Sequence, residues 1–169
     1  MKENKRVVWS WAFYDWANSA YSTTVMAGFF PLFFKEYWAD PNNPSQSTFY
    51  LGMANSIASM VVAALAPLLG SVADQGSAKK KFLTFFSFLG VIMTGGLWMV
   101  AQGNWQMAVL FYVIATIGFA SGNVFYDALL PGLASEERVD AVSSLGFGLG
   151  YLGGGLLFLV NVFMYLKPE

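Results

Sequence analysis

Residues 82–130 read FLTFFSFLGVIMTGGLWMVAQGNWQMAVLFYVIATIGFASGNVFYDALL, and Asp127 is the only charged residue among them. A short polar turn, Gln-Gly-Asn, divides this stretch into apolar runs at 82–101 and 105–130. A helix rises about 1.5 Å per residue, so either run is long enough to cross a hydrocarbon core of about 30 Å. The stretch therefore predicts two membrane-spanning helices, and Asn104 is expected to cap the start of the second.

Three further apolar runs of similar length flank this pair. They lie at about 7–34, 48–72 and 142–166, and the turn Asp-Pro-Asn-Asn-Pro at 40–44 separates the first two. The predicted fold is all-α, a polytopic membrane helix bundle with five transmembrane helices over residues 1–169 and no soluble domain.

The composition excludes several classes of protein. Hydrophobic residues make up 56% of the chain and charged residues 11%, compared with about a quarter charged in soluble domains. The mean hydropathy is +0.51. The chain has no Cys and no His, which removes disulfides, thiolate nucleophiles and imidazole bases or ligands. We expect no enzyme activity, metal or cofactor, and the formal charge of -1 offers nucleic acid no general attraction.

The distribution of Lys and Arg predicts the orientation in the membrane. A cytoplasmic N-terminus places seven basic residues inside and leaves Lys35 and Lys167 outside. Positive charge concentrates on the cytoplasmic side of membrane proteins. The inside set is Lys2, Lys5, Arg6, Lys79, Lys80, Lys81 and Arg138.

Two of the predicted spans carry polar residues on one helical face. Candidate substrate-cavity residues are Tyr14, Asp15, Asn18, Ser22, Tyr112, Asn123 and Tyr126. Such residues line a solute path in many membrane proteins. The alternative is hydrogen bonding between helices, which only holds the bundle together. Asp15 has the same two interpretations: it binds a proton or a substrate cation, or it bonds Asn18, Ser19 or a neighbouring helix.

Small residues follow one line on each of two other spans. In 48–72 the line runs from Gly52 to Gly70, and in 142–166 it contains Gly146, Gly150 and Gly154. These glycines are candidate helix-packing positions, because a side without Cβ atoms lets another helix approach closely. Static packing explains such a face, and sliding of one helix against another is the alternative.

The loop between the second and third spans resembles the signature of the major facilitator superfamily. It reads GSVADQGSAKKK from Gly70, with Asp74, Gly76, Lys79 and Lys80 as the candidate gating residues. Gln75 stands where that signature usually has Arg. The segments SWAFYDWANSAYST from Ser10, FYDALLP from Phe125 and GFGLGYLGGG from Gly146 resemble the vacuole-effluxer-like branch of the superfamily.

This resemblance implies that the chain is the first part of a larger transporter. It implies an incomplete N-terminal half of a twelve-helix carrier that moves a small polar solute, amino acids being the suggested class, by alternating access. The implied partners are the solute, a coupling proton, the bilayer and the missing C-terminal half. The implied location is the plasma membrane, or the vacuolar membrane in a fungus. The alternative function is a structural or assembly subunit that acts through its glycine faces.

Overall fold

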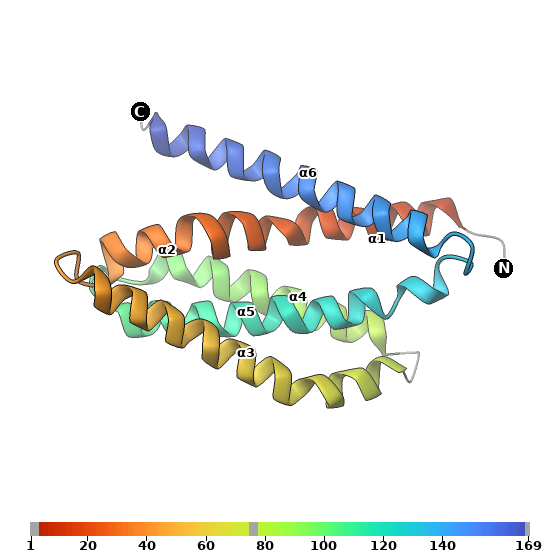
Figure 1. The fold of residues 1–169 in the computed structure, drawn as a ribbon, viewed down its shortest axis with the longest axis horizontal. Coiled ribbons are helices and arrows are strands. Elements are labelled where there is room, and N and C mark those ends of the chain that lie inside the picture. The colour runs from red at the N-terminus through yellow and green to blue at the C-terminus, as the bar shows by residue number, and fades with distance from the viewer. Residues whose placement is uncertain (1–3, 75–77, 168–169) are drawn as a thin grey trace. The chain divides into compact units, whose positions relative to one another are not determined.

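The computed structural model describes residues 4–74 and 78–167, and all regular structure in these ranges is helical (Figure 1). The chain divides into two compact units. One comprises residues 1–30 and 129–169, and the other comprises residues 31–128.

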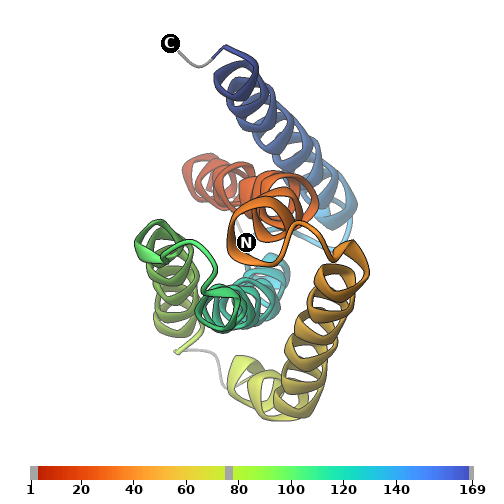
Figure 2. The ribbon, with the colours of Figure 1, turned by 90° about the vertical axis from the view of Figure 1, so that its left-hand side faces the viewer.

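The unit formed by residues 31–128 contains three long helices, α3 (Pro44–Asp74), α4 (Lys79–Gly96) and α5 (Trp105–Asp127). Helix α5 packs against both α4 and α3, and Figures 1 and 2 show α4 and α5 side by side. A short 3₁₀ turn, Leu97–Met99, ends α4 before the polar turn that leads into α5.

Local signals explain where these helices begin. Pro44 occupies the first position of α3, and Asn43 Oδ1 accepts a hydrogen bond from the backbone N–H of Gln46 at 3.2 Å. Asn104 Oδ1 accepts from the N–H of Met107 at 3.3 Å, which confirms the predicted cap of α5. Gly103 precedes that cap with φ +78°, a left-handed conformation that favours glycine.

Aromatic stacking joins the three helices near the end of α5. Phe125 is fully buried and stacks on Phe82 and Phe86 of α4, with ring centroids 5.2 and 5.9 Å apart. Leu69 and Ala73 of α3 close the same cluster. Phe125 therefore packs against both neighbouring helices at once.

Helices α4 and α5 approach each other closely at Gly118. A Cβ added there would lie 2.9 Å from two backbone atoms of α4, Gly90 N and Phe86 O. Backbone atoms cannot swing aside as a side-chain end can. The absent side chain at Gly118 therefore sets the distance between the two helices.

Gly118→Ala is expected to lower the stability of the full-length protein by about 1–3 kcal/mol, because the methyl group forces α4 and α5 apart. Gly95→Ala in α4 is the matched control, since a Cβ there meets nothing within 4 Å. Thermal unfolding in detergent measures both variants. Equal midpoints for the two would show that the close approach does not limit packing.

The unit formed by residues 1–30 and 129–169 contains α1 (Lys5–Ala20) and α6 (Val139–Leu166), which pack against each other. After Ala20 the chain continues as a π-helical segment, Tyr21–Phe29, and then as α2 (Phe30–Phe33). A second π-helical segment, Phe34–Trp38, follows in the other unit.

The change from α to π geometry begins where hydroxyl side chains cluster. Ser22 Oγ and Thr23 Oγ1 both donate to the carbonyl oxygen of Ser19, at 2.9 and 3.0 Å. Hydroxyl groups that bond back to a carbonyl in the preceding turn compete with the helical N–H bonds. The widened part of the predicted first span thus begins next to two hydroxyl groups that bond the preceding turn.

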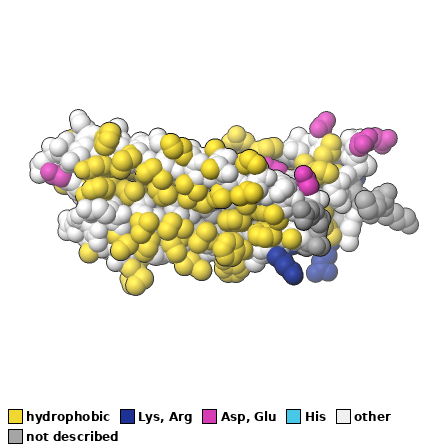
Figure 3. Space-filling view, turned by 90° about the horizontal axis from the view of Figure 1, so that it is seen from below, with side chains coloured by type: hydrophobic (Ala, Val, Ile, Leu, Met, Phe, Trp, Pro, Cys, Tyr) yellow, Lys and Arg dark blue, Asp and Glu magenta, His cyan; other side chains and the backbone are white. Residues whose placement is uncertain are grey.

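Four helices of the described residues are long and apolar enough to cross a membrane: α3, α4 continued to Met99, α5 continued to Gly132, and α6. They correspond to the predicted spans at 48–72, 82–101, 105–130 and 142–166. The predicted span at 7–34 is divided among α1, the first π-helical segment and α2. The all-helical fold is confirmed, whereas the count of five spans stays a prediction. Figure 3 shows hydrophobic side chains over most of the face that it displays.

Candidate functional site

Asp15 lies in the middle of α1 and is half-buried. Its Oδ1 accepts a hydrogen bond from Ser19 Oγ, one turn further along the same helix, at 3.3 Å. Within residues 4–74 and 78–167 this is the only hydrogen bond of the carboxylate, and no cation pairs with it. A hydrogen bond with Ser19 is predicted by the interpretation in which Asp15 has a structural role. It leaves Oδ2 without a hydrogen-bond donor among those residues.

Three glycines of α6 bring that helix close to the polar face of α1. A Cβ at Gly150 would meet Asp15 and Ser19, and a Cβ at Gly154 would meet Thr23 Oγ1 at 2.8 Å and Ser19 O at 3.1 Å. A Cβ at Gly153 would collide with the backbone and ring of Trp16. The glycine face of α6 thus packs on α1. Gly146 is buried on the same helix.

The other candidate residues of the predicted first span lie in α1 and in the π-helical segment that follows it. Tyr14, Asn18 and Ser22 are all half-buried. Ser22 Oγ bonds the carbonyl of Ser19, so its hydroxyl belongs to the start of the π-helical segment. The sequence placed Asp15 and Ser22 on one face, and both contact Ser19 in the structure.

The candidate residues of α5 lie in the other unit. Tyr112 is 2% exposed, and its hydroxyl donates to Asn55 Oδ1 of α3 at 2.8 Å. This is a hydrogen bond between helices, the alternative that the sequence left open for such residues. Tyr126 is buried and Asn123 is half-buried. Sequence reasoning missed the pairing of Tyr112 with Asn55. The positions of both residues well inside apolar runs could have suggested it.

The loop candidates lie at the ends of α3 and α4. Asp74 is the last residue of α3 and is exposed, as is Lys80, while Gly70 is half-buried with nothing within 4 Å of an added Cβ. Lys79 Nζ donates to the carbonyl oxygen of Ala128, just beyond α5, at 2.9 Å. A cation there also stabilises the negative end of the helix dipole. Gly76 lies outside the described residues.

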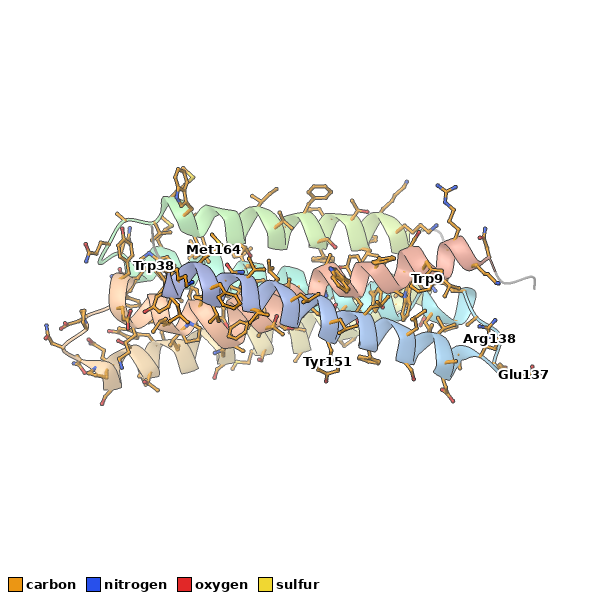
Figure 4. All side chains as sticks on the ribbon, turned by 90° about the horizontal axis from the view of Figure 1, so that it is seen from above. Trp9, Trp38, Glu137, Arg138, Tyr151 and Met164 are labelled. Carbon is orange, nitrogen blue, oxygen red and sulfur yellow. The ribbon has the colours of Figure 1, made fainter. Side chains whose placement is uncertain are left out.

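Helices α3 and α6 both have faces that are open to their surroundings. On α3 the exposed small residues include Gly52, Ser56, Ser59, Ala63 and Ala66, and a Cβ at Gly52 meets nothing within 4 Å. On α6 the exposed residues include Phe147 and Tyr151, and Tyr151 is 79% exposed. Figure 4 shows the Tyr151 side chain pointing away from the ribbon of α6.

Comparisons with known proteins show which protein family this chain is similar to. The profile of the family described as "Vacuole effluxer Atg22 like" matches residues 42–169. An uncharacterized MFS-type transporter of Bacillus subtilis (strain 168), YxiO, is 44% identical over 161 residues, which cover 95% of this chain and 38% of the relative. An uncharacterized protein of Aquifex aeolicus (strain VF5) is 26% identical over 160 residues, covering 95% of this chain and 39% of that protein.

The chain thus spans about two fifths of the length of these relatives. No solved structure matches it. The profile extends over α3 to α6, and each of the two relatives is matched over 95% of the chain.

Proposed function

We propose, from the premise that this chain belongs to the vacuole effluxer Atg22-like family, that it is part of a secondary transporter of the major facilitator type. The family supports this proposal, as does the name of the Bacillus subtilis relative, an MFS-type transporter. The chain would supply helices of the N-terminal half, and the full-length protein would move a small polar solute by alternating access.

The observation that carries the proposal is the carboxylate of Asp15. An acidic side chain within an apolar helix is costly unless a proton, a cation or hydrogen bonds neutralise it. Ser19 supplies one hydrogen bond at 3.3 Å, and the described residues supply no cation. The carboxylate is thus suited to bind a coupling proton or the ammonium group of a solute.

Amino acids are the solute class that we propose, because their α-ammonium group complements a carboxylate. The remaining candidates, Tyr14, Asn18, Ser22, Tyr112, Asn123 and Tyr126, offer hydroxyl and amide groups that can bond a solute's polar atoms. Ser22 and Tyr112 already form hydrogen bonds within the protein. Either residue would have to give up its present bond in order to bind a solute.

Uptake by the reconstituted full-length protein tests the proposal. Proteoliposomes would receive each of the standard amino acids in tritiated form, with a proton gradient of either direction and with none. Uptake of at least one amino acid above that of protein-free liposomes supports the proposed function. Absence of uptake for all of them, with protein correctly inserted, would overturn the amino-acid assignment.

The membrane arrangement is part of the same proposal. We place the N-terminus and the Lys79–Lys81 cluster in the cytoplasm, because most basic residues then lie inside. We place the protein in the plasma membrane, or in the vacuolar membrane of a fungus. The remainder of the longer protein would pack on the open small-residue face of α3.

Asp74 is the proposed gating residue, since it ends α3 at the loop that resembles the facilitator signature. Asp74→Asn in the full-length protein is expected to slow uptake without reducing insertion, because a charge that stabilises one access state is lost. The measurement is the initial uptake rate per inserted molecule. An unchanged rate would make Asp74 an ordinary solvated acid of the loop.

A further inference from the structure

Gly150 of α6 lies against both partners of the Asp15–Ser19 hydrogen bond. A Cβ built on Gly150 would be 2.7 Å from Asp15 Oδ2, 3.0 Å from Asp15 Cγ and 2.6 Å from Ser19 Oγ. Each of these distances is shorter than ordinary contact between a methyl carbon and another heavy atom. A side chain at position 150 would therefore compete with the carboxylate and the hydroxyl for the same space.

The surrounding contacts leave α6 little freedom to move away. Gly153 contacts Trp16 of α1, and Gly154 contacts Thr23 of the π-helical segment, so these contacts lie on either side of Ser19. The hydrogen bond from Ser19 Oγ to Asp15 Oδ1 is already long at 3.3 Å. Crowding at position 150 would consequently be relieved by rotation of Asp15 or Ser19, which breaks the bond between them.

We propose that Gly150 is the positioning residue for Asp15: its missing side chain leaves the space in which Ser19 holds the Asp15 carboxylate. This inference rests on the proposed role of Asp15 in transport. It gives Gly150 a role beyond close packing, because the atoms that a methyl group would displace belong to the one acidic side chain in the middle of α1.

The titratable residues near Asp15 in its own unit are few. On α1 the neighbour is Tyr14, and Tyr21 follows about 9 Å further along the helix at 1.5 Å per residue. On α6 the neighbour of Gly150 is Tyr151, which is 79% exposed and points away from the helix (Figure 4). Arg6 precedes Asp15 by nine residues on α1, which is roughly 14 Å along the helix. Asp140 precedes Gly150 by ten residues on α6, which is roughly 15 Å.

The test compares three alanine variants of the full-length protein that differ in what the new methyl group meets. Gly150→Ala meets Asp15 and Ser19. In Gly153→Ala the new methyl group also lies between α6 and α1, but it meets Trp16. In Gly148→Ala the methyl group meets nothing within 4 Å. The probe is N,N′-dicyclohexylcarbodiimide, which reacts with protonated carboxyl groups in apolar surroundings, and mass spectrometry measures the modified fraction of Asp15.

At pH 7, Asp15 of Gly150→Ala is expected to react with the carbodiimide at least about three times faster than Asp15 of the parent protein. The hydrogen bond from Ser19 favours the charged carboxylate, which does not react, and the variant loses this bond. Ser19→Ala should give a similar increase, and the double variant should exceed neither single variant by much, since both changes remove the same bond. Gly153→Ala and Gly148→Ala should label at the parent rate.

Two results would overturn the inference: a parental labelling rate in Gly150→Ala, or an equal increase in Gly153→Ala, which would make the effect one of helix packing. If Gly150→Ala fails to accumulate, Ser19→Ala decides, because a parental rate there means that the pair does not control the carboxylate. Transport separates the two proposals. Normal uptake by Asp15→Asn defeats the proposed role of Asp15 in transport, whereas altered labelling in Gly150→Ala would still stand.

Discussion

Replacing Asp15 with Asn in the full-length protein is expected to lower the uptake rate by about 10- to 100-fold. This range corresponds to one hydrogen bond to a charged group, worth about 1.5–3 kcal/mol, with each 1.4 kcal/mol being a factor of ten. Asn has nearly the shape of Asp and can still accept from Ser19 Oγ, so the helix contact survives. What the variant loses is the negative charge and the ability to bind a proton.

The pH profile of uptake between pH 5 and 8 distinguishes the two roles of Asp15. A proton site predicts that the variant loses the dependence of uptake on the proton gradient. A site for a solute cation predicts a higher solute concentration at half-maximal rate and an unaltered gradient dependence. Asp140→Asn is the control, since that acid is exposed at the start of α6. Parental uptake and profile in Asp15→Asn would leave Asp15 a role in packing.

The helices could be predicted from the sequence because their signals are local. Apolar length fixed the runs that became α3 to α6, and the Asn104 side chain caps α5 as its position before Trp105 indicated. Charge and turn residues gave the ends of these helices to within a few residues. Each of these signals depends on neighbours in the chain and needs no knowledge of the packing.

The interruption of the predicted first span could not be predicted in the same way. Hydrophobicity describes residues 7–34 as one span, whereas the structure widens the helix from Tyr21 onward. The hydroxyls of Ser22 and Thr23 both bond Ser19 O, and the balance between these bonds and the helical N–H bonds depends on small energies. The average hydrophobicity of a segment contains no information about that balance.

Helix partners are the other feature that the sequence leaves open. Periodicity identified the glycine face of residues 142–166 but not the helix that packs against it. In the structure Gly150, Gly153 and Gly154 pack on α1. A glycine face indicates that another helix packs closely against it, but it does not identify that helix. The pairing of Tyr112 with Asn55 was hidden for the same reason.

Phe125 is expected to be the most sensitive aromatic position for folding. Its side chain is fully buried and stacks at interplanar angles of 13° and 14° on Phe82 and Phe86. Leu69 and Ala73 of α3 belong to the same cluster. Removing the ring would leave a cavity bordered by three helices, and well-packed helices can fill such a space only in part.

Phe125→Ala should therefore destabilise the full-length protein by about 3–5 kcal/mol, the range for truncation of a buried phenylalanine. Lipid or detergent does not reduce this loss much, because the cavity lies inside the protein and the lost contacts are dispersion contacts. Phe88→Ala on α4 is the matched control: its side chain is 61% exposed, so its effect should stay within about 0.5 kcal/mol. Thermal unfolding in detergent measures both. Similar unfolding midpoints for the two variants would mean that the stack does not hold α3, α4 and α5 together.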